Sequence, residues 1–205
     1  MPSRISNTRL FGASAAIAST LFLATGVEAQ SPPEAEQIAQ AVQPAPPMLR
    51  GGAMVYGFDD GGAFVTLREG TNDLICLADD PNRDGFNVAC YHDSLEPFMA
   101  RGRELRAEGV TDSGELAQRR WDEADAGTLS MPETPATLYV MTGDGFDAAA
   151  GEVMNSFLRW VVYTPWATPE TTGLPPMPVA PGAPWLMFPG TAGAHIMITP
   201  PAGGN

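Results

Sequence analysis

The chain contains no lysine, so all eleven of its basic residues are arginines. Without a side-chain amine, the protein itself cannot form Schiff bases with a substrate. Aspartate and glutamate together number 24, which gives a formal net charge of −13 at pH 7. A surface of this sign repels nucleic acids and anionic lipids, so we expect no nucleic-acid partner. The acidity itself is typical of a solvated surface.

Long hydrophobic runs are almost missing. The one extended apolar run, Phe11–Leu23, is too short and too rich in Ala, Ser and Thr to be a membrane span. Arg4 and Arg9 precede it, and residues 27–29 follow it with small side chains at the positions that a signal peptidase reads. These parts predict a signal peptide over residues 1–29. They also predict a periplasmic or secreted protein with no membrane span after cleavage.

Cysteine is scarce, because Cys76 and Cys90 are the only two in the chain. In an exported protein such a pair favours a disulfide bond. The bond would close a loop of 15 residues, a constraint worth about 3 kcal/mol in the chain-entropy model. The Cys-x-x-Cys spacing of redox-active pairs is absent.

Proline and glycine divide the rest of the chain. Residues 30–48 are rich in Pro and Ala, which predicts a linker or a short helix over Glu34–Val42 that a proline cluster ends. Residues 49–205 are predicted to form a single globular domain. Half of the twenty prolines lie between Pro165 and Pro201, interspersed with tryptophan and other apolar residues. This composition predicts an irregular segment that wraps the domain.

Patterning in the middle of the chain predicts both strands and helices. Two apolar runs around an Asp-Asp-Gly-Gly turn favour a β-hairpin. Asp93 and Glu96 have the spacing of a capping box at a helix start, and Asp112 or Ser113 is a cap for a second helix. The predicted strands are 53–58, 63–68, 73–77, 87–91, 137–142, 156–164 and 194–198, and the predicted helices are 93–108 and 112–125. The order predicts an α+β fold with a mainly antiparallel sheet, two central helices and an irregular proline-rich C-terminal wrap.

The chain has two histidines, His92 and His195, and with Asp93 they are the candidate catalytic residues. Two imidazoles and a carboxylate can bind zinc, and a His–Asp pair can activate a hydroxyl such as that of Ser94. Neither H-E-x-x-H nor G-x-S-x-G spacing is present. The structural interpretation is that His92 belongs to a helix N-terminus and that His195 is a core histidine that donates to a backbone carbonyl. Strand alternation leaves His195 either on a covered face or on a partly exposed face of the last strand, and we expect the partly exposed one.

One segment resembles the start of a calcium-binding loop. Asp80, Asn82 and Asp84 occupy the first, third and fifth positions and are the candidate metal ligands. Position twelve is Tyr91 instead of a bidentate glutamate, and Arg83 places a positive charge among the ligands. Clusters of Asp, Asn, Gly and Pro are also typical of ordinary turns. We therefore predict no bound metal and no cofactor.

Three stretches resemble a group of exported bacterial proteins that have no assigned activity. The first is the Leu-Arg-Glu-Gly-Thr-Asn sequence at 67–72 followed by Cys76, the Asp-Asp-Pro turn at 79–81 and Cys90. The others are Pro-Phe-Met-Ala-Arg-Gly-Arg-Glu-Leu-Arg at 97–106 and the closing Ala-His-Ile-Met-Ile at 194–198. The resemblance implies a single exported domain and carries no site residues.

Two functions follow as hypotheses. The first is a non-catalytic binding or envelope-interaction domain, which the lack of any catalytic spacing and the acidic surface favour. The alternative is a small hydrolase or metal-dependent enzyme centred on His92 and His195. The sequence does not identify a partner.

Overall fold

The computed structural model describes residue 1 and residues 31–200. The predicted cleavage site and nearly all of the predicted signal peptide lie outside the described residues. The fold is α+β, as predicted, and its main sheet has eight strands in the order β2-β1-β3-β4-β5-β8-β10-β9. The strands are β1 Met54–Phe58, β2 Phe64–Arg68, β3 Leu74–Leu77, β4 Phe86–His92, β5 Ala136–Gly143, β8 Phe157–Tyr163, β9 Trp185–Met187 and β10 His195–Ile198.

The sheet is mostly antiparallel, in agreement with the sequence. β1 and β2 form the predicted hairpin, and β3 and β4 form the predicted second pair. One pairing departs from the rule, because β1 and β3 run parallel. The chain must cross from the end of β2 back to the start of β3 to make this pair. That crossing makes the sheet mixed.

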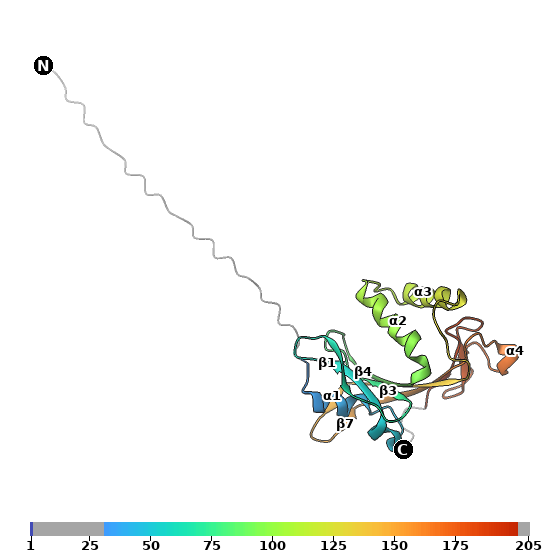
Figure 1. Ribbon diagram of the computed structural model, residues 1–205, viewed down its shortest axis with the longest axis horizontal. Coiled ribbons are helices and arrows are strands. Elements are labelled where there is room, and N and C mark those ends of the chain that lie inside the picture. Colours follow the sequence, from blue (N-terminus) through green and yellow to red (C-terminus); the bar gives the residue numbers. More distant parts are fainter. Residues whose placement is uncertain (2–30, 201–205) are drawn as a thin grey trace.

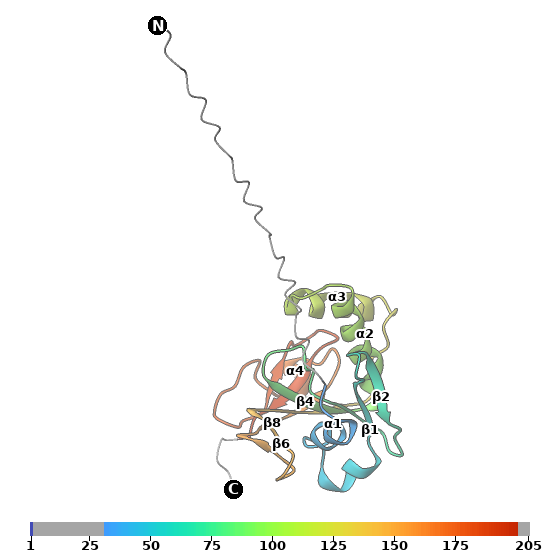
Figure 2. The same ribbon diagram turned by 90° about the vertical axis from the view of Figure 1, so that its left-hand side faces the viewer.

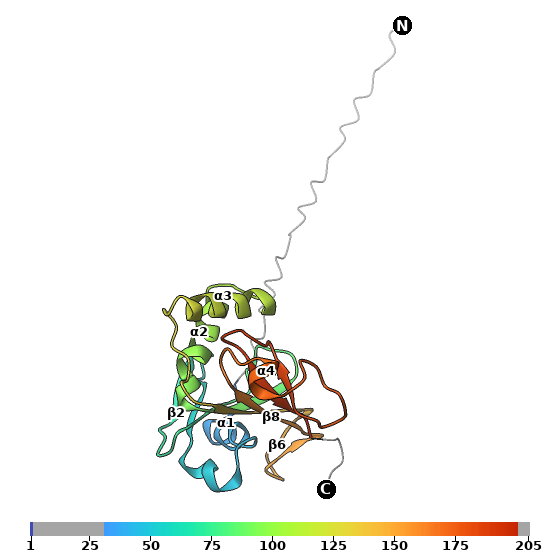
Figure 3. The ribbon, with the colours of Figure 1, turned by 90° about the vertical axis from the view of Figure 1, so that its right-hand side faces the viewer.

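The helices divide between the two faces of the sheet. α2 (Glu96–Ala107) and α3 (Ser113–Asp125) stack above one face, whereas α1 (Glu34–Ala41) lies under the other (Figures 1, 2 and 3). A small hairpin of β6 (Gly145–Asp147) and β7 (Glu152–Met154) lies on the α1 side. The short elements are η1 Pro47–Gly52, η2 Asp93–Leu95 and α4 Pro169–Thr172. No helix in the described part of the chain is long and apolar enough to cross a membrane.

The α1 side of the sheet contains the disulfide. Cys76 and Cys90 are directly opposed on β3 and β4 and are bonded to each other, as predicted. Both are fully buried beneath α1, against Ala41 and neighbouring apolar residues. Gln37 fixes the helix, because its amide both accepts from the backbone N–H of Phe58 and donates to the Phe58 carbonyl, at 2.9 and 2.8 Å. Part of the segment 30–48 is thus a helix packed on the sheet.

The opposite side contains an aromatic core. Tyr91 from β4, Phe98 from α2 and Tyr163 from β8 are almost fully buried in one cluster. Phe98, Gly102 and Leu105 form the buried stripe of α2, at the spacing of one helix face. Because Gly102 has no side chain, the Arg120 guanidinium of α3 can lie beside it.

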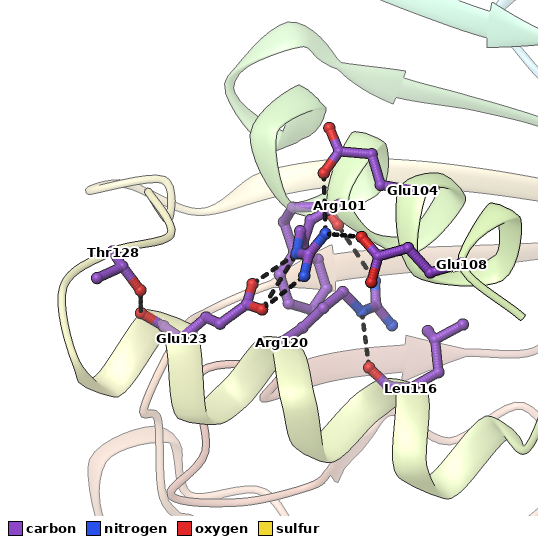
Figure 4. A network of polar contacts seen from close by, with 8 residues as sticks. Arg101, Glu104, Glu108, Leu116, Arg120, Glu123 and Thr128 are labelled. Atoms are coloured by element: carbon purple, nitrogen blue, oxygen red, sulfur yellow. Dashed lines mark hydrogen bonds and ion pairs between the residues drawn. The ribbon is translucent and has the colours of Figure 1, made fainter. Parts of the chain in front are cut away.

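Arg101 ties α2 to α3. Its guanidinium lies between Glu104 and Glu108 of its own helix and Glu123 of α3, with the closest atoms 2.8 to 3.1 Å apart (Figure 4). This contact with Arg101 lowers the pKa of Glu123. Arg120 contributes a second contact, since it stacks 4.1 Å from the ring centre of Phe98. The two helices therefore form one unit above the sheet.

The helix starts agree with the sequence in one case and differ in the other. Asp112 caps α3, and its carboxylate accepts from the N–H of Glu115 at 2.8 Å. The capping box expected from Asp93 and Glu96 is wrong, because a 3-10 turn over Asp93–Leu95 precedes α2. That turn is capped by the ring of His92 instead.

The segment between β8 and β10 makes several contacts with the rest of the fold. Trp166 donates from its indole to Asp125 of α3 at 2.8 Å, and its backbone N–H donates to the Thr191 carbonyl. Leu186 of β9 is fully buried, although β9 is an edge strand. At Gly193 an added side-chain carbon would overlap the indole of Trp121, so the backbone lies directly against α3.

Candidate functional site

The contacts of His92 are those of a helix cap. Its Nδ1 accepts from the backbone N–H of Ser94 at 3.2 Å and lies 2.8 Å from the Ser94 hydroxyl. The carboxylate of Asp93 approaches the same nitrogen at 3.2 Å. In a catalytic triad the acid and the hydroxyl contact different ring nitrogens. Here both contact Nδ1, so Asp93 cannot orient the ring from its second nitrogen while the first takes a proton from Ser94.

His195 is buried, with an exposed fraction of 8%, so the expected partly exposed position was wrong. Its ring packs against Tyr163 and Phe188, with ring centres 5.0 and 5.7 Å apart. Nδ1 lies 2.7 Å from the Gly193 carbonyl, which can only accept, so this nitrogen donates. Burial lowers the pKa of His195, and the bond to Gly193 opposes this only in part. Phe188 covers this face of the sheet. The sequence could not show this, because Phe188 is far along the chain from α3 and β8.

The two histidines project from opposite faces of the sheet. His195 pairs with Tyr163, which pairs with Ala136, and by strand alternation these lie on the face of Tyr91. His92 follows Tyr91 and therefore points to the other side. The strands β5 and β8 also lie between β4 and β10, a separation of about 14 Å at the usual strand spacing. The two histidines do not contact each other, so the structure gives no support to the enzyme alternative, which stays a prediction.

The acidic loop is organised as a turn. Asp80 accepts from the N–H of Asn82 at 3.0 Å, the pattern of an Asx turn. Its neighbour Asp79 accepts from the N–H of Asn87 at 2.8 Å. Burial raises the pKa of Asp79 despite this bond. Within residues 31–200 no group of three or more His, Cys, Asp or Glu side chains is arranged to hold a metal ion, and Asp84 belongs to no such group.

A groove of about 660 Å³ opens between α2 and the sheet. Its volume lies in the range of small-molecule sites, roughly 300–1,000 Å³. Apolar side chains form its floor and its walls, and charged ones gather along α2 and at the acidic loop. The lining residues are Tyr56, Phe58, Phe64, Leu77, Ala78, Asp80, Arg83, Asn87, Ala89, Glu96, Ala100, Arg103, Glu104, Arg106 and Ala107.

Small side chains create this space. Ala100 and Ala107 lie on the stripe of α2 that faces away from its buried stripe, and Ala89 of β4 lies beneath them. The first turns of α2 pack on the sheet through Phe98, whereas its end packs on α3 through Leu105. Figure 1 shows α2 rising from the sheet toward α3 along its length. The second half of the helix therefore stands off from the sheet.

Arg103 is held in place at the hairpin end of the groove. It forms an ion pair with Glu96 at 2.5 Å, and it donates to the hydroxyl of Tyr91 at 3.1 Å. Its guanidinium then lies over the rings of Tyr56 and Phe64, 5.7 and 5.1 Å from their centres. Burial raises the pKa of Tyr91 well above its usual value, so this phenol stays protonated and donates to Glu96. The network positions Arg103 against the aromatic wall.

Arg83 of the acidic loop and Arg106 of α2 also line the groove, with fewer contacts than Arg103. Among the described residues, neither Arg83 nor Arg106 forms an ion pair. Arg106 makes one hydrogen bond, to the Gly102 carbonyl of its own helix. Burial and the nearby charges of Arg83 and Arg103 lower the pKa of Arg106, while Asp80 acts in the opposite direction. Asp80 lines the same part of the groove, and Asp79 and Asp84 lie beside Arg83, so this part carries charges of both signs.

The groove was not predicted from the sequence. The one signal of it in the sequence is a helical spacing that places four lining residues on one side of a helix, namely Glu96, Ala100, Arg103 and Ala107. Comparison of the chain with protein-family models, with curated proteins and with solved structures finds no match. The resemblance to exported bacterial proteins therefore stays a prediction, and the geometry alone carries the argument on function.

Proposed function

We propose that the protein is an exported, non-catalytic domain that binds a ligand in the groove between α2 and the sheet. The groove supports this proposal by its volume of about 660 Å³ and by its lining, in which aromatic and small apolar residues surround a few charged groups. Such a mixture of apolar walls and a few placed polar groups is typical of ligand sites. The buried disulfide Cys76–Cys90 is consistent with an oxidising compartment, the periplasm or the exterior.

The composition of the groove favours binding over chemistry. Its lining contains no histidine, cysteine or serine within the described residues, and these residues supply most nucleophiles and general bases. Glu96 is engaged by both Tyr91 and Arg103. The network thus holds the shape of the groove, and Glu96 is not free to act as a general base.

A neutral probe tests the proposal. N-phenyl-1-naphthylamine fluoresces in apolar surroundings, and we expect it to bind the folded domain, residues 30–205, in a saturable manner. Ala100→Trp should fill the groove and abolish this binding. Ala126→Trp is the matched control, because Ala126 is exposed at the end of α3 and lines no part of the groove.

Circular dichroism should show that both variants are folded. Absence of saturable binding to the folded wild-type domain would refute the proposal. Equal binding by the Ala100→Trp variant would refute it as well, because the probe would then occupy another surface.

A further inference from the structure

We propose that the ligand of the groove is an extended peptide segment of a partner protein, which adds a strand to the open edge of β2 and places an apolar side chain beside Phe64. This inference rests on the proposed function, since it names the class of ligand that binds at the hairpin end of the same groove. It follows from the backbone of β2, from the exposed ring of Phe64 and from the charges at the nearby turn.

β2 directs four backbone groups away from the sheet. In an antiparallel pair, opposed residues alternate between those that bond to each other and those whose N–H and C=O groups point outward. Phe58 is opposite Phe64, and the N–H and the carbonyl of Phe58 are both bonded to Gln37. Tyr56 is opposite Thr66, and its carbonyl accepts from the residue that follows β3. The N–H and C=O groups of Phe64 and Thr66 therefore face away from β1.

This edge of the sheet is open. β2 is the outermost strand and contains neither proline nor lysine, two residues that commonly protect strand edges (Figure 2). The opposite edge is covered by the chain itself, because Leu186 of β9 donates to the carbonyl of Pro175 at 2.9 Å. Within the described residues, no such contact reaches the outward groups of Phe64 or Thr66. An added strand would pair with them, as in other cases of peptide recognition at a sheet edge.

Phe64 connects the open edge to the groove. Its ring lies on the face of the sheet that α2 covers, since the Arg103 guanidinium of α2 lies over it. The ring lines the groove and is 39% exposed. A strand beside β2 would place every second side chain on this same face, next to Phe64. An apolar side chain at that position would cover the exposed ring.

The charges around the hairpin favour a basic peptide. Asp59 and Asp60 are exposed in the turn before β2, and neither forms an ion pair within the described residues. Arg68, the one charged residue of β2, lies at the far end of the strand and donates to the Ala53 carbonyl. The three acidic and three basic residues that line the groove cancel. A second copy of this chain is disfavoured as the occupant, because both copies would carry a net charge of −13.

A synthetic peptide with basic ends tests the inference. The peptide Arg-Thr-Val-Thr-Phe-Thr-Arg has its apolar side chains on one face of a strand, and basic ends allow either strand direction. We expect it to bind the domain, residues 30–205, in a saturable manner and to displace N-phenyl-1-naphthylamine. The same peptide with glutamate at both ends should bind about fivefold more weakly, the size of an exposed ion pair. N-methylation of two adjacent central residues removes one N–H toward β2 in any register and should weaken binding at least tenfold, roughly the effect of one hydrogen bond.

Thr66→Pro makes the matching change in the protein. Proline is tolerated on an edge strand where the N–H faces outward, so this variant loses an outward donor without losing a bond to β1. Peptide binding should weaken about tenfold, again the effect of one hydrogen bond. Thr66→Val is the control, because it keeps the N–H and the branched side chain, and it should bind the peptide as the wild type does. Circular dichroism should show that both variants are folded, and both should bind the dye normally.

The outcomes separate this inference from the proposed function. A wild-type domain that binds the dye but not the peptide would overturn the inference and leave groove binding intact. Peptide binding that leaves the dye in place would overturn it as well. Equal binding by a folded Thr66→Pro variant or by the N-methylated peptide would exclude strand pairing, and the N-methylated peptide decides alone if the variant does not fold. Self-association of the domain that Thr66→Pro abolishes would assign the edge to a second copy instead. Failure of the dye to bind would refute the proposed function.

Discussion

Replacing His195 by phenylalanine should remove part of the loss of stability that the protein suffers in mild acid. His195 is 8% exposed and is surrounded by aromatic rings. Burial lowers its pKa from the ordinary value of 6.5. As the pH falls below 6.5, the unfolded chain binds a proton at this position and the folded protein does not.

The sign and the size follow from proton linkage. The folded state has its full stability above pH 6.5 and loses it as the pH falls toward the lowered pKa of the folded protein. The slope is at most about 1.4 kcal/mol per pH unit. Between pH 7 and pH 5 the contribution of His195 to the loss is therefore at most about 1.9 kcal/mol, reached when the folded protein binds no proton there.

Urea unfolding followed by tryptophan fluorescence, repeated between pH 5 and pH 7.5, measures this effect. His195→Phe should lower the free energy of unfolding at pH 7 by about 1–3 kcal/mol, because the Gly193 carbonyl loses its donor. Its stability should then fall less than that of the wild type on acidification. Asp79, Glu123 and the other acids remain in both proteins, so their contributions cancel in the difference.

His92→Gln is the matched control, since it removes the other histidine, whose side chain is 43% exposed. This variant keeps His195 and should therefore lose more stability than His195→Phe between pH 7 and pH 5. The reasoning fails if His195→Phe and the wild type lose stability in parallel between pH 7 and pH 5. It also fails if the difference has the opposite sign, which would mean that folding favours the protonated ring.

Two further predictions concern the core. Cys76→Ser/Cys90→Ser should lower the free energy of unfolding by about 2–5 kcal/mol, measured by urea denaturation. Urea denaturation of the wild type with a reductant present should give the same lowered free energy, and an unchanged stability would contradict a structural role for the disulfide. Gly193→Ala should destabilise the fold by about 1–3 kcal/mol, because the added methyl group overlaps Trp121. In Gly51→Ala the methyl group meets no atom within 4 Å, so the melting temperature should not change. Equal effects of the two substitutions would disprove the close approach of the Gly193 backbone to Trp121.

Local patterning predicted most of the strands and helices because their signals lie within the segments themselves. The Asp-Asp-Gly-Gly turn fixed the β1–β2 hairpin, and Asp112 marked the start of α3. The disulfide was predictable from the scarcity of cysteine. The capping residue before α2 was not, because Asp93 and His92 both suit a helix start and only the backbone geometry decides between them.

What the sequence could not provide is long-range arrangement. The parallel pairing of β1 with β3 depends on how the chain crosses the sheet. The burial of His195 depends on Phe188, which packs against its ring and in turn contacts Trp121 of α3. The groove arises because α2 leaves the sheet to pack on α3, so its lining combines residues from the first hairpin, the acidic loop and the helix. No local sequence pattern predicts that the hairpin, the acidic loop and α2 lie next to one another.

The disulfide beneath α1 has a consequence for the order in which the protein matures. Cys76 and Cys90 have no exposed surface once Ala41 and its helix cover them. We therefore expect the thiols to be accessible to an oxidant only before α1 docks, although α1 precedes both cysteines in the chain. Oxidation precedes the final closure of the fold, and α1 afterwards shields the bond from soluble reductants until it detaches.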